Sequence, residues 1–249
     1  MRSKKLSKKI MMGVAALGVS AVVVTNANAS QPGFYLGGLL GWGKVHEENI
    51  SRGDMNAVTS SAIKSNNFTT NSFKNSGVDS GAAGRLFAGY QFNENWAAEM
   101  GWSKFRNMTT NASLSGIDKV SGLPYQSTAS GTLKTDAFDL VAKGIYPITN
   151  NINVYGKLGV AYLMQRANAS VHVSETAKRG SVPVNALSKS GSGSNNEHKI
   201  YPTFGVGATY EFTQNVAADL SWNRIQKTGG SKSMASTDLV GVGLIYSIG

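Results

Sequence analysis

The sequence predicts an all-β fold, an eight-stranded antiparallel transmembrane β-barrel with three short periplasmic turns and four long external loops. Three observations predict it. Segments in which apolar and polar residues alternate recur eight times, and the connections between them are short and long in strict alternation. After the first thirty residues, no stretch reaches the ~18 consecutive apolar residues that indicate a membrane-spanning helix. A chain of this kind crosses a membrane only as strands.

The clearest hairpin covers residues 86–92 and 96–102. In both segments every second residue is apolar, whereas the alternate positions carry Gln91, Glu99 and glycine, with Arg85 directly before the first segment. A period of two with one apolar face is typical of a half-buried strand. Because aromatic residues lie near the ends of the apolar face, we expect that face to contact lipid.

The other expected strands repeat this pattern. Together the eight strands cover residues 33–45, 86–92, 96–102, 135–146, 152–165, 199–212, 216–223 and 240–248. Three turns of a few residues join them at residues 93–95, 147–151 and 213–215. The four long connections cover residues 46–79, 107–134, 166–198 and 227–236, and are rich in Ser, Asn, Thr, Gly and Lys. We expect these connections to be loops at one end of the barrel, as in outer-membrane proteins, and the one that contains residues 172–175 to be flexible.

A soluble, lipocalin-like barrel is the alternative, with the apolar faces turned inward around a ligand. Its exterior would carry long charged residues for solubility. Here the polar parity is mostly Gly, Ala, Ser and Thr with isolated charges. Small residues of this kind fit a narrow lumen in which a few long side chains need room, so the pattern favours the membrane barrel.

Residues 1–29 have the order of a secretory signal peptide. A region with five basic residues precedes an apolar stretch from Ile10 to Val24, and small residues in an Ala-x-Ala arrangement end at Ala29. We expect cleavage after Ala29, leaving one domain at residues 30–249. A membrane anchor is the alternative, but ~15 apolar residues fall short of the ~20 needed to span a bilayer.

Charge and cysteine content exclude several function classes. The chain has 24 Lys and Arg against 14 Asp and Glu; five of the basic residues lie in the leader, so the remaining excess is modest. No dense basic stripe is present, and we expect no nucleic-acid partner. Basic loop tips instead favour anionic sugar or lipid head groups. The absence of cysteine excludes thiol catalysis and cysteine-based metal sites.

The inward parity gathers three basic and three acidic residues, which we expect to form an ion-pair network in the lumen. These are Arg85, Glu99, Asp139, Lys143, Lys157 and Asp219. An isolated ion in a tight lumen is poorly solvated, so the charges need one another. We therefore expect a plugged interior, either as purely structural neutralisation or as a working gate.

The outward aromatic residues lie mainly toward strand ends, as amphipathic rings do at lipid head groups. The expected lipid-facing girdle consists of Trp42, Tyr90, Phe92, Trp102, Tyr146, Tyr162, Tyr210, Trp222 and Tyr246. Further aromatic residues assigned to the same placement include Phe34, Tyr35 and Phe105.

Catalysis finds little support. His46, His172 and His198 share no metal-ligand spacing and fall in loops or at strand ends, so we expect no metal site, cofactor or catalytic residue. Residues 172–175, His-Val-Ser-Glu, contain the His-x-Ser element of barrel deacylases that trim lipid A, but the surrounding residues do not match. The glycine-rich residues 37–43 lack the following helix of a nucleotide-binding fingerprint.

Residues 142–159 resemble the fourth and fifth strands of the OmpA transmembrane domain, and residues 89–93 and 98–102 resemble its second and third strands. The chain is thus similar to the OmpA/OmpX-like family of small outer-membrane β-barrels. The resemblance implies that Glu99 and Lys143 belong to an internal ion-pair cluster that gates solute flow. Nothing follows the eighth strand, so we expect the peptidoglycan-binding domain of full OmpA to be missing.

These observations predict a non-enzymatic protein of the cell outer membrane that supports envelope integrity. The alternatives are a narrow, porin-like ion channel and, last, a lipid-modifying enzyme. Expected partners are outer-membrane lipid and lipopolysaccharide, and the barrel-assembly machinery, whose terminal signal residues 243–248 resemble. Family resemblance adds adhesion to a host or matrix ligand through the loops. We expect a monomer, while the ligand of the loops is not readable from composition.

Overall fold

The computed structural model of the chain describes residues 32–46, 52–64, 67–179, 182–228 and 235–248. The strands and the helix, in chain order, are β1 Gly33–His46, α1 Arg52–Ile63, β2 Phe68–Val78, β3 Ser80–Asn93, β4 Trp96–Phe105, β5 Met108–Asp118, β6 Pro124–Pro147, β7 Ile152–Arg179, β8 Val182–Glu211, β9 Val216–Ile225 and β10 Ser236–Ile248. The expected leader, residues 1–29, lies outside the described residues. In the part of the chain that is described, no helix is long and apolar enough to span a membrane.

Eight strands close into a ring. Their order is β6-β4-β3-β1-β10-β9-β8-β7, and pairing of β7 with β6 completes the circle. Every pairing is antiparallel, including the one between the first and last strands, where Phe34 lies opposite Ile248 and His46 opposite Ser236. A closed ring leaves no unpaired strand edge, which is the condition for strands to cross a bilayer. The eight-stranded barrel expected from the sequence is confirmed.

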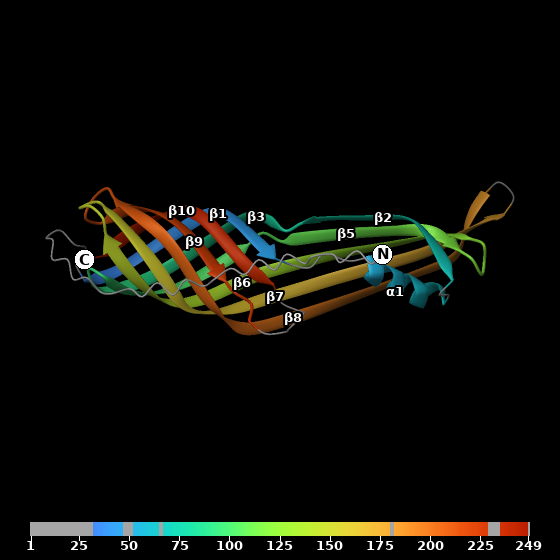
Figure 1. Cartoon of the computed structure of the whole chain (residues 1–249), viewed down its shortest axis with the longest axis horizontal. Coiled ribbons are helices and arrows are strands. Elements are labelled where there is room, and N and C mark those ends of the chain that lie inside the picture. The colour runs from blue at the N-terminus through green and yellow to red at the C-terminus, as the bar shows by residue number, and fades with distance from the viewer. Residues whose placement is uncertain (1–31, 47–51, 65–66, 180–181, 229–234, 249) are drawn as a thin grey trace, which may run out of the picture.

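Three short turns lie at one end of the barrel, and Figure 1 shows the start of β1 and the end of β10 at the same end. The backbone amide of Ile148 bonds to the carbonyl of Ile152, and that of Phe212 to the carbonyl of Val216. The Asn93 side chain accepts hydrogen bonds from the amides of Asn95 and Trp96. Asn and Thr side chains thus satisfy backbone groups that the sheet leaves open at this end.

The long connections are more ordered than the sequence suggested. The connection after β1 contains α1 and β2, and the connection after β4 contains β5. Strands β6, β7 and β8 continue far beyond the ring, with lengths of 24, 28 and 30 residues. These three connections therefore contain regular secondary structure, and even residues 190–196 of the Ser-Gly-Asn stretch lie within β8.

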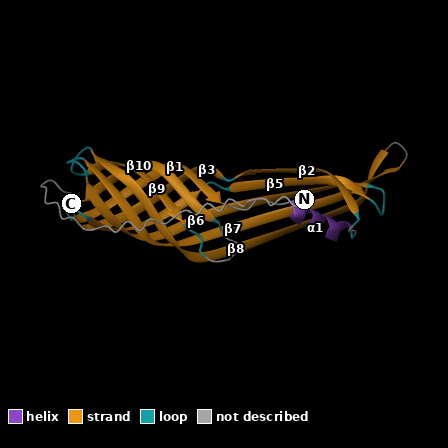
Figure 2. Ribbon diagram, in the orientation of Figure 1, coloured by secondary structure: helices purple, strands orange, loops and turns teal. Residues whose placement is uncertain are grey.

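These additions form a sheet that we call the extension. It consists of β2, β5 and residues 124–133, 166–179 and 182–198 of β6, β7 and β8, in the order β2-β5-β6-β7-β8. Figure 2 shows these strands running on from the ring, with the helix α1 beside them. The residue Met55 of α1 packs against Ala112, Leu114 and Tyr125. The face that α1 covers is the inner face of the extension.

The inner face of the ring continues without interruption into the inner face of the extension. On β6 the buried positions are odd-numbered, from Lys143 in the ring to Tyr125 in the extension, and β7 shows the same from Tyr155 to Val173. Successive side chains of a strand point to opposite sides, so an unbroken strand keeps its parity. The lumen and the helix-covered core are therefore two parts of one surface.

The outer face of the ring is an apolar band between two aromatic belts. Near the turns, Phe34, Tyr90 and Phe92 form edge-to-face contacts at 4.8 and 5.3 Å between ring centroids. Near the extension, Trp102 stacks on Phe138 at 6.4 Å. Exposed aliphatic residues between the belts include Leu36, Leu40, Leu86, Met100, Leu140, Leu158, Val206, Leu220, Val242 and Leu244.

The spacing of the belts fits an outer membrane. Phe34 and Trp42 belong to the two belts on β1 and are eight residues apart, which corresponds to about 26 Å along a strand. At the usual strand tilt this becomes a height of about 20 Å, close to the apolar band of outer-membrane barrels.

Candidate functional site

Glu99 is the centre of a buried charge network in the lumen. Its side chain is fully enclosed, with 0% of its surface exposed. Glu99 Oε1 accepts hydrogen bonds of 2.6 Å from Arg85 Nη1 and from Lys157 Nζ. Glu99 Oε2 accepts one from the Tyr35 hydroxyl at 3.1 Å and lies 3.8 Å from Lys143 Nζ. One carboxylate therefore serves three cations.

A second carboxylate completes the charge balance around Arg85. Asp139 accepts two hydrogen bonds from the same guanidinium, from Nη2 at 2.6 Å and from Nε at 3.2 Å. This paired geometry fixes the orientation of Arg85, which also lies 4.9 Å from the centroid of the Phe87 ring. Removal of either acid would leave Arg85 short of a partner in a nearly dry interior.

The two lysines are held by aromatic faces as well as by Glu99. Lys143 Nζ lies 4.1 Å from the centroid of the Tyr155 ring, and Lys157 Nζ lies 5.0 Å from the same centroid. Lys143 also faces Tyr35 at 5.5 Å. Attraction between a cation and the face of a ring strengthens when water is excluded. These rings thus supply part of the solvation that the lysines lose.

Asp219 takes part in the network through a hydroxyl. It accepts a hydrogen bond from the Tyr155 hydroxyl at 2.5 Å and another from Ser221 Oγ at 3.2 Å. The structure thus brings together all six residues that the sequence placed in the lumen, but Asp219 is joined to the lysines through Tyr155 and not by an ion pair among the described residues. With three cations and three carboxylates the cluster is formally neutral.

Glycine makes room for these long side chains. A Cβ atom on Gly101 would overlap the Arg85 guanidinium, and one on Gly89 would overlap the Tyr35 ring. Each of these glycines lies on the strand next to that of the long residue. The narrow lumen therefore accommodates these large side chains where the neighbouring strand carries no side chain of its own. The glycine-rich parity and the charge network therefore depend on each other.

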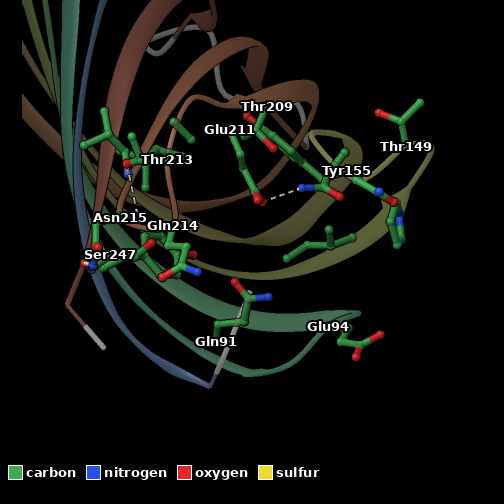
Figure 3. Close-up of a pocket in the computed structure, with 18 of the residues that line it drawn as sticks. Gln91, Glu94, Thr149, Tyr155, Thr209, Glu211, Thr213, Gln214, Asn215 and Ser247 are labelled. Atoms are coloured by element: carbon green, nitrogen blue, oxygen red, sulfur yellow. Dashed lines mark hydrogen bonds between the residues drawn. The ribbon is translucent and has the colours of Figure 1, made fainter. Parts of the chain in front are cut away.

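The network divides the lumen in two. A cavity of about 160 Å³ lies at the turn end, lined by Tyr35, Lys143 and Tyr155 among others. Figure 3 shows it among the turns, where Glu211 accepts a hydrogen bond of 2.8 Å from Asn153. A second cavity of about 20 Å³ lies against Arg85 and Lys157. The two cavities share no lining residue, and Glu99 lines neither, which places it between them.

Sequence reasoning missed the aromatic side of this cluster. The expectation that Tyr35 and Phe105 lie among the aromatic residues at the lipid head groups is wrong, because they are only 5% and 4% exposed and face inward. The parity of each strand carried the signal, since Tyr35 is adjacent to the outward Phe34 and so points the opposite way. Tyr155 lies on the same parity as Lys157 and would have been found in the same way.

The nine residues expected in the girdle all point outward. Eight are exposed by 36 to 60%, and Trp222 is half-buried, with its indole N–H donating a hydrogen bond of 3.1 Å to Asp238. The eight exposed ones are Trp42, Tyr90, Phe92, Trp102, Tyr146, Tyr162, Tyr210 and Tyr246.

The three histidines do not meet. His46 pairs with Asp238 at 2.5 Å at the barrel rim, and His198 stacks on Tyr162 with a centroid separation of 5.9 Å. His172 lies in the middle of β7 within the extension, so the expectation that residues 172–175 form a flexible loop is wrong. Among the described residues, no group of three potential ligands could hold a metal ion.

A closed ring of eight antiparallel strands, an apolar band between aromatic belts and a charge-filled interior define a small β-barrel of the outer membrane. The model of the OmpA-like transmembrane domain matches residues 29–249, and the chain belongs to this family. A protein of Coxiella burnetii, described only as uncharacterized, is 28% identical over 96% of this chain and 98% of its own length. Outer membrane protein A of Klebsiella aerogenes is 24% identical over 97% of this chain.

The chain spans 56% of the length of that Klebsiella protein. Among solved structures, the outer membrane protein OprG of Pseudomonas aeruginosa is similar over 88% of this chain and 99% of its own, with 12% identity and a TM-score of 0.46. The attachment invasion locus protein Ail of Yersinia pestis is similar over 88% of this chain and 100% of its own chain, with 14% identity and a TM-score of 0.38.

Proposed function

We propose that this outer-membrane protein is a closed, non-enzymatic barrel that supports the envelope and holds the extension outside the cell as a rigid, sheet-built projection. Residues 1–29 are a leader removed during export. The observation that carries the proposal is the neutral network around Glu99, which fills the lumen between two separate cavities. A solute would have to break buried, charge-assisted hydrogen bonds to pass.

Reconstitution into planar lipid bilayers tests the closed lumen. The wild-type protein should give no resolved unitary currents. The proposal would be contradicted by unitary currents in the wild type whose amplitude differs in Glu99→Ala or Lys143→Ala. The amplitude in Lys44→Ala would then equal that of the wild type. Lys44 is the matched control, because its ion pair with Asp79 lies outside the network and is about half exposed. That outcome would establish the narrow channel instead.

Adhesion is the second candidate function, and the extension is the observation that favours it. The part of the molecule farthest from the turns is the end of the extension at which β7 and β8 project beyond the other strands (Figure 1). A variant lacking residues 169–193 would join Asn168 to Ser194, which already lie opposite each other. If the extension binds a host cell or matrix, cells that display this variant should bind less than cells that display equal amounts of the wild type. Equal binding removes these residues from the adhesion surface.

A further inference from the structure

The outer face of the extension, on the side away from α1, is an array of mostly uncharged polar side chains. Cross-strand neighbours on β2, β5, β6, β7 and β8 form four rows: Ser72-Ser115-Gln126-Ser174-Ser188, Lys74-Ser113-Thr128-His172-Ser190, Ser76-Asn111-Ser130-Ser170-Ser192 and Val78-Thr109-Thr132-Asn168-Ser194. We call these rows the hydroxyl face. All twenty side chains are exposed or half-exposed.

The composition of the hydroxyl face restricts its partner. It carries no acidic residue, its charged and titratable members are Lys74 and His172, and Val78 is its single aliphatic residue. The cores of protein interfaces are apolar and rich in aromatic residues, so this face is a poor surface for a protein. Hydroxyl and amide groups both donate and accept hydrogen bonds, as the 2.7 Å contact between Ser130 Oγ and Ser170 Oγ shows. Sugar hydroxyls have the same chemistry.

Two cations lie directly opposite each other at the base of this face. Lys134 of β6 is the cross-strand partner of Arg166 of β7, and both side chains are exposed. Like charges in this arrangement destabilise a sheet. Among the described residues neither forms an ion pair, and Arg166 Nε donates its hydrogen bond to a neutral group, Asn196 Oδ1, at 2.9 Å. An anion between the two cations would remove the repulsion.

The nearby acid lies opposite a different cation. Asp136 lies on the same side of β6, two residues from Lys134, and its cross-strand partner on β4 is Lys104. On β7 the partner of Asp136 is the uncharged Met164. The outward-facing surroundings therefore keep a net positive charge, which is concentrated at Lys134 and Arg166.

The height of the cation pair matches the lipid surface. Lys134 is four residues beyond Phe138, and Arg166 is four residues beyond Tyr162, the aromatic residues of the belt near the extension. Four residues correspond to about 13 Å along a strand, or about 10 Å in height at the usual tilt. Aromatic belts lie at head-group level, so the pair faces the outer rim of the head groups.

We propose that Lys134 and Arg166 hold a phosphate of a phosphorylated saccharide lipid, the lipopolysaccharide of the outer leaflet, and that the saccharide runs along the hydroxyl face. The proposal names a site for the lipid and depends on the outer-membrane location, not on the closed lumen. The cations bind the phosphate by charge-assisted hydrogen bonds, and the rows above them give the sugar chain a flat surface of donors and acceptors.

Titration of the purified full-length protein in detergent with fluorescently labelled lipopolysaccharide tests the cation pair. Lys134→Gln together with Arg166→Gln should raise the Kd about tenfold, as expected when charge-assisted hydrogen bonds are lost. The matched control is Lys104→Gln, exposed on the neighbouring strand but opposite Asp136, which should change the Kd less than about twofold. Chemical removal of the lipid phosphates should abolish the difference between the wild type and the double variant.

Stability without lipid separates binding from misfolding. If the cations repel each other, the double variant should melt at the same temperature as the wild type, or slightly higher, when lipid is absent. When lipid is added, the melting temperature of the double variant should rise less than that of the wild type. A second variant, Thr128→Ala with Ser130→Ala and Ser170→Ala, should weaken binding of lipopolysaccharide with a long sugar chain and leave binding of lipid A unchanged. An unchanged Kd in the double variant, or inorganic phosphate competing as strongly as the lipid, would overturn the site. Currents through the lumen would refute the closed barrel and leave this site untouched.

Discussion

The barrel and the extension are built from the same strands in two different solvents. Strands β6, β7 and β8 run through both, and their inward parity does not change. The residue types at their outward positions do change: Phe138 and Leu140 lie on the outside of the ring, and Thr128 and Ser130 lie on the outside of the extension. Antiparallel pairing continues along these strands from the ring into the extension. The medium outside therefore determines the residue type, while the pairing determines the shape.

The inner faces differ in how they are filled. The ring packs long charged and aromatic side chains from all sides against thin glycine walls, and the extension covers small residues such as Ala112 and Ala129 with a single helix. The ring has no edges, whereas the extension ends at β2 on one side and at residues 182–198 of β8 on the other. We therefore expect disruption to be global in the ring and local in the extension.

The largest expected difference comes from the same substitution made in each region. Gly101→Leu would place a side chain where the Arg85 guanidinium lies, and overpacking of this kind distorts its surroundings. We expect this variant not to fold into a heat-modifiable barrel, as judged by gel migration with and without boiling. Gly191→Leu in the extension meets no atom within 4 Å and should migrate like the wild type. Equal behaviour of the two variants would contradict the contrast.

Next in size is the loss of the central carboxylate. Glu99→Gln leaves Arg85, Lys143 and Lys157 with one acid fewer, and breaking a buried ion pair typically costs about 3–5 kcal/mol. Urea unfolding of the refolded protein in lipid vesicles would measure this loss. Asp136→Asn, which removes a half-exposed acid outside the network, should cost less than about 1 kcal/mol. A similar cost for both would show that the network does not stabilise the fold.

A smaller and local effect is expected for the helix. Met55 is 1% exposed beneath α1, and replacing a buried Met by Ala costs about 2–5 kcal/mol. Because α1 packs against strands of the extension, Met55→Ala should speed proteolysis within residues 52–78 and leave the heat-modifiable barrel intact. Val58→Ala, at a site that is 38% exposed, is the control and should be cleaved at the wild-type rate. Loss of the barrel in Met55→Ala would show that the two regions unfold together.

The smallest effect concerns pH and is confined to the extension. Burial and the charge of Asp118 raise the pKa of Glu175 above its ordinary value, and Glu175 Oε1 has no hydrogen-bond partner among the described residues. A raised pKa means that the folded form holds the proton more tightly, so this contribution to stability is complete below the ordinary glutamate pKa and is lost as pH rises through the raised one. Proteolysis of the extension should therefore quicken between mildly acidic and neutral pH.

Glu175→Gln should make that rate independent of pH over the same interval, because the amide mimics the protonated acid without titrating. A rate that still rises in this variant would assign the pH dependence to another group.

The alternation of residue types along a strand explains both what could be predicted from the sequence and what could not. In the ring, Leu or Trp alternates with Gly, Asp or Lys, and this contrast was sufficient to place the strands and the six charged residues of the lumen. In the extension, as from Tyr125 to Leu133, Ser and Thr alternate with mostly small residues that include another Ser, and the contrast is too weak to separate a strand from a polar loop. The helix α1 was missed for a similar reason, since only Met55 and Thr59 are buried along it. The sequence placed Glu99 and Lys157 in one network, but that these two residues pair directly is seen only in the closed ring.

The filled lumen also has a consequence for how the molecule is made. With about 20 Å³ free beside Arg85 and Lys157, the finished ring has no room for a polypeptide to thread through it. We therefore expect the polar strands of the extension to reach the outer side before β6 and β7 join the other strands in a circle. Translocation would then precede closure, and the neutral cluster around Glu99 would form after the projecting sheet has crossed.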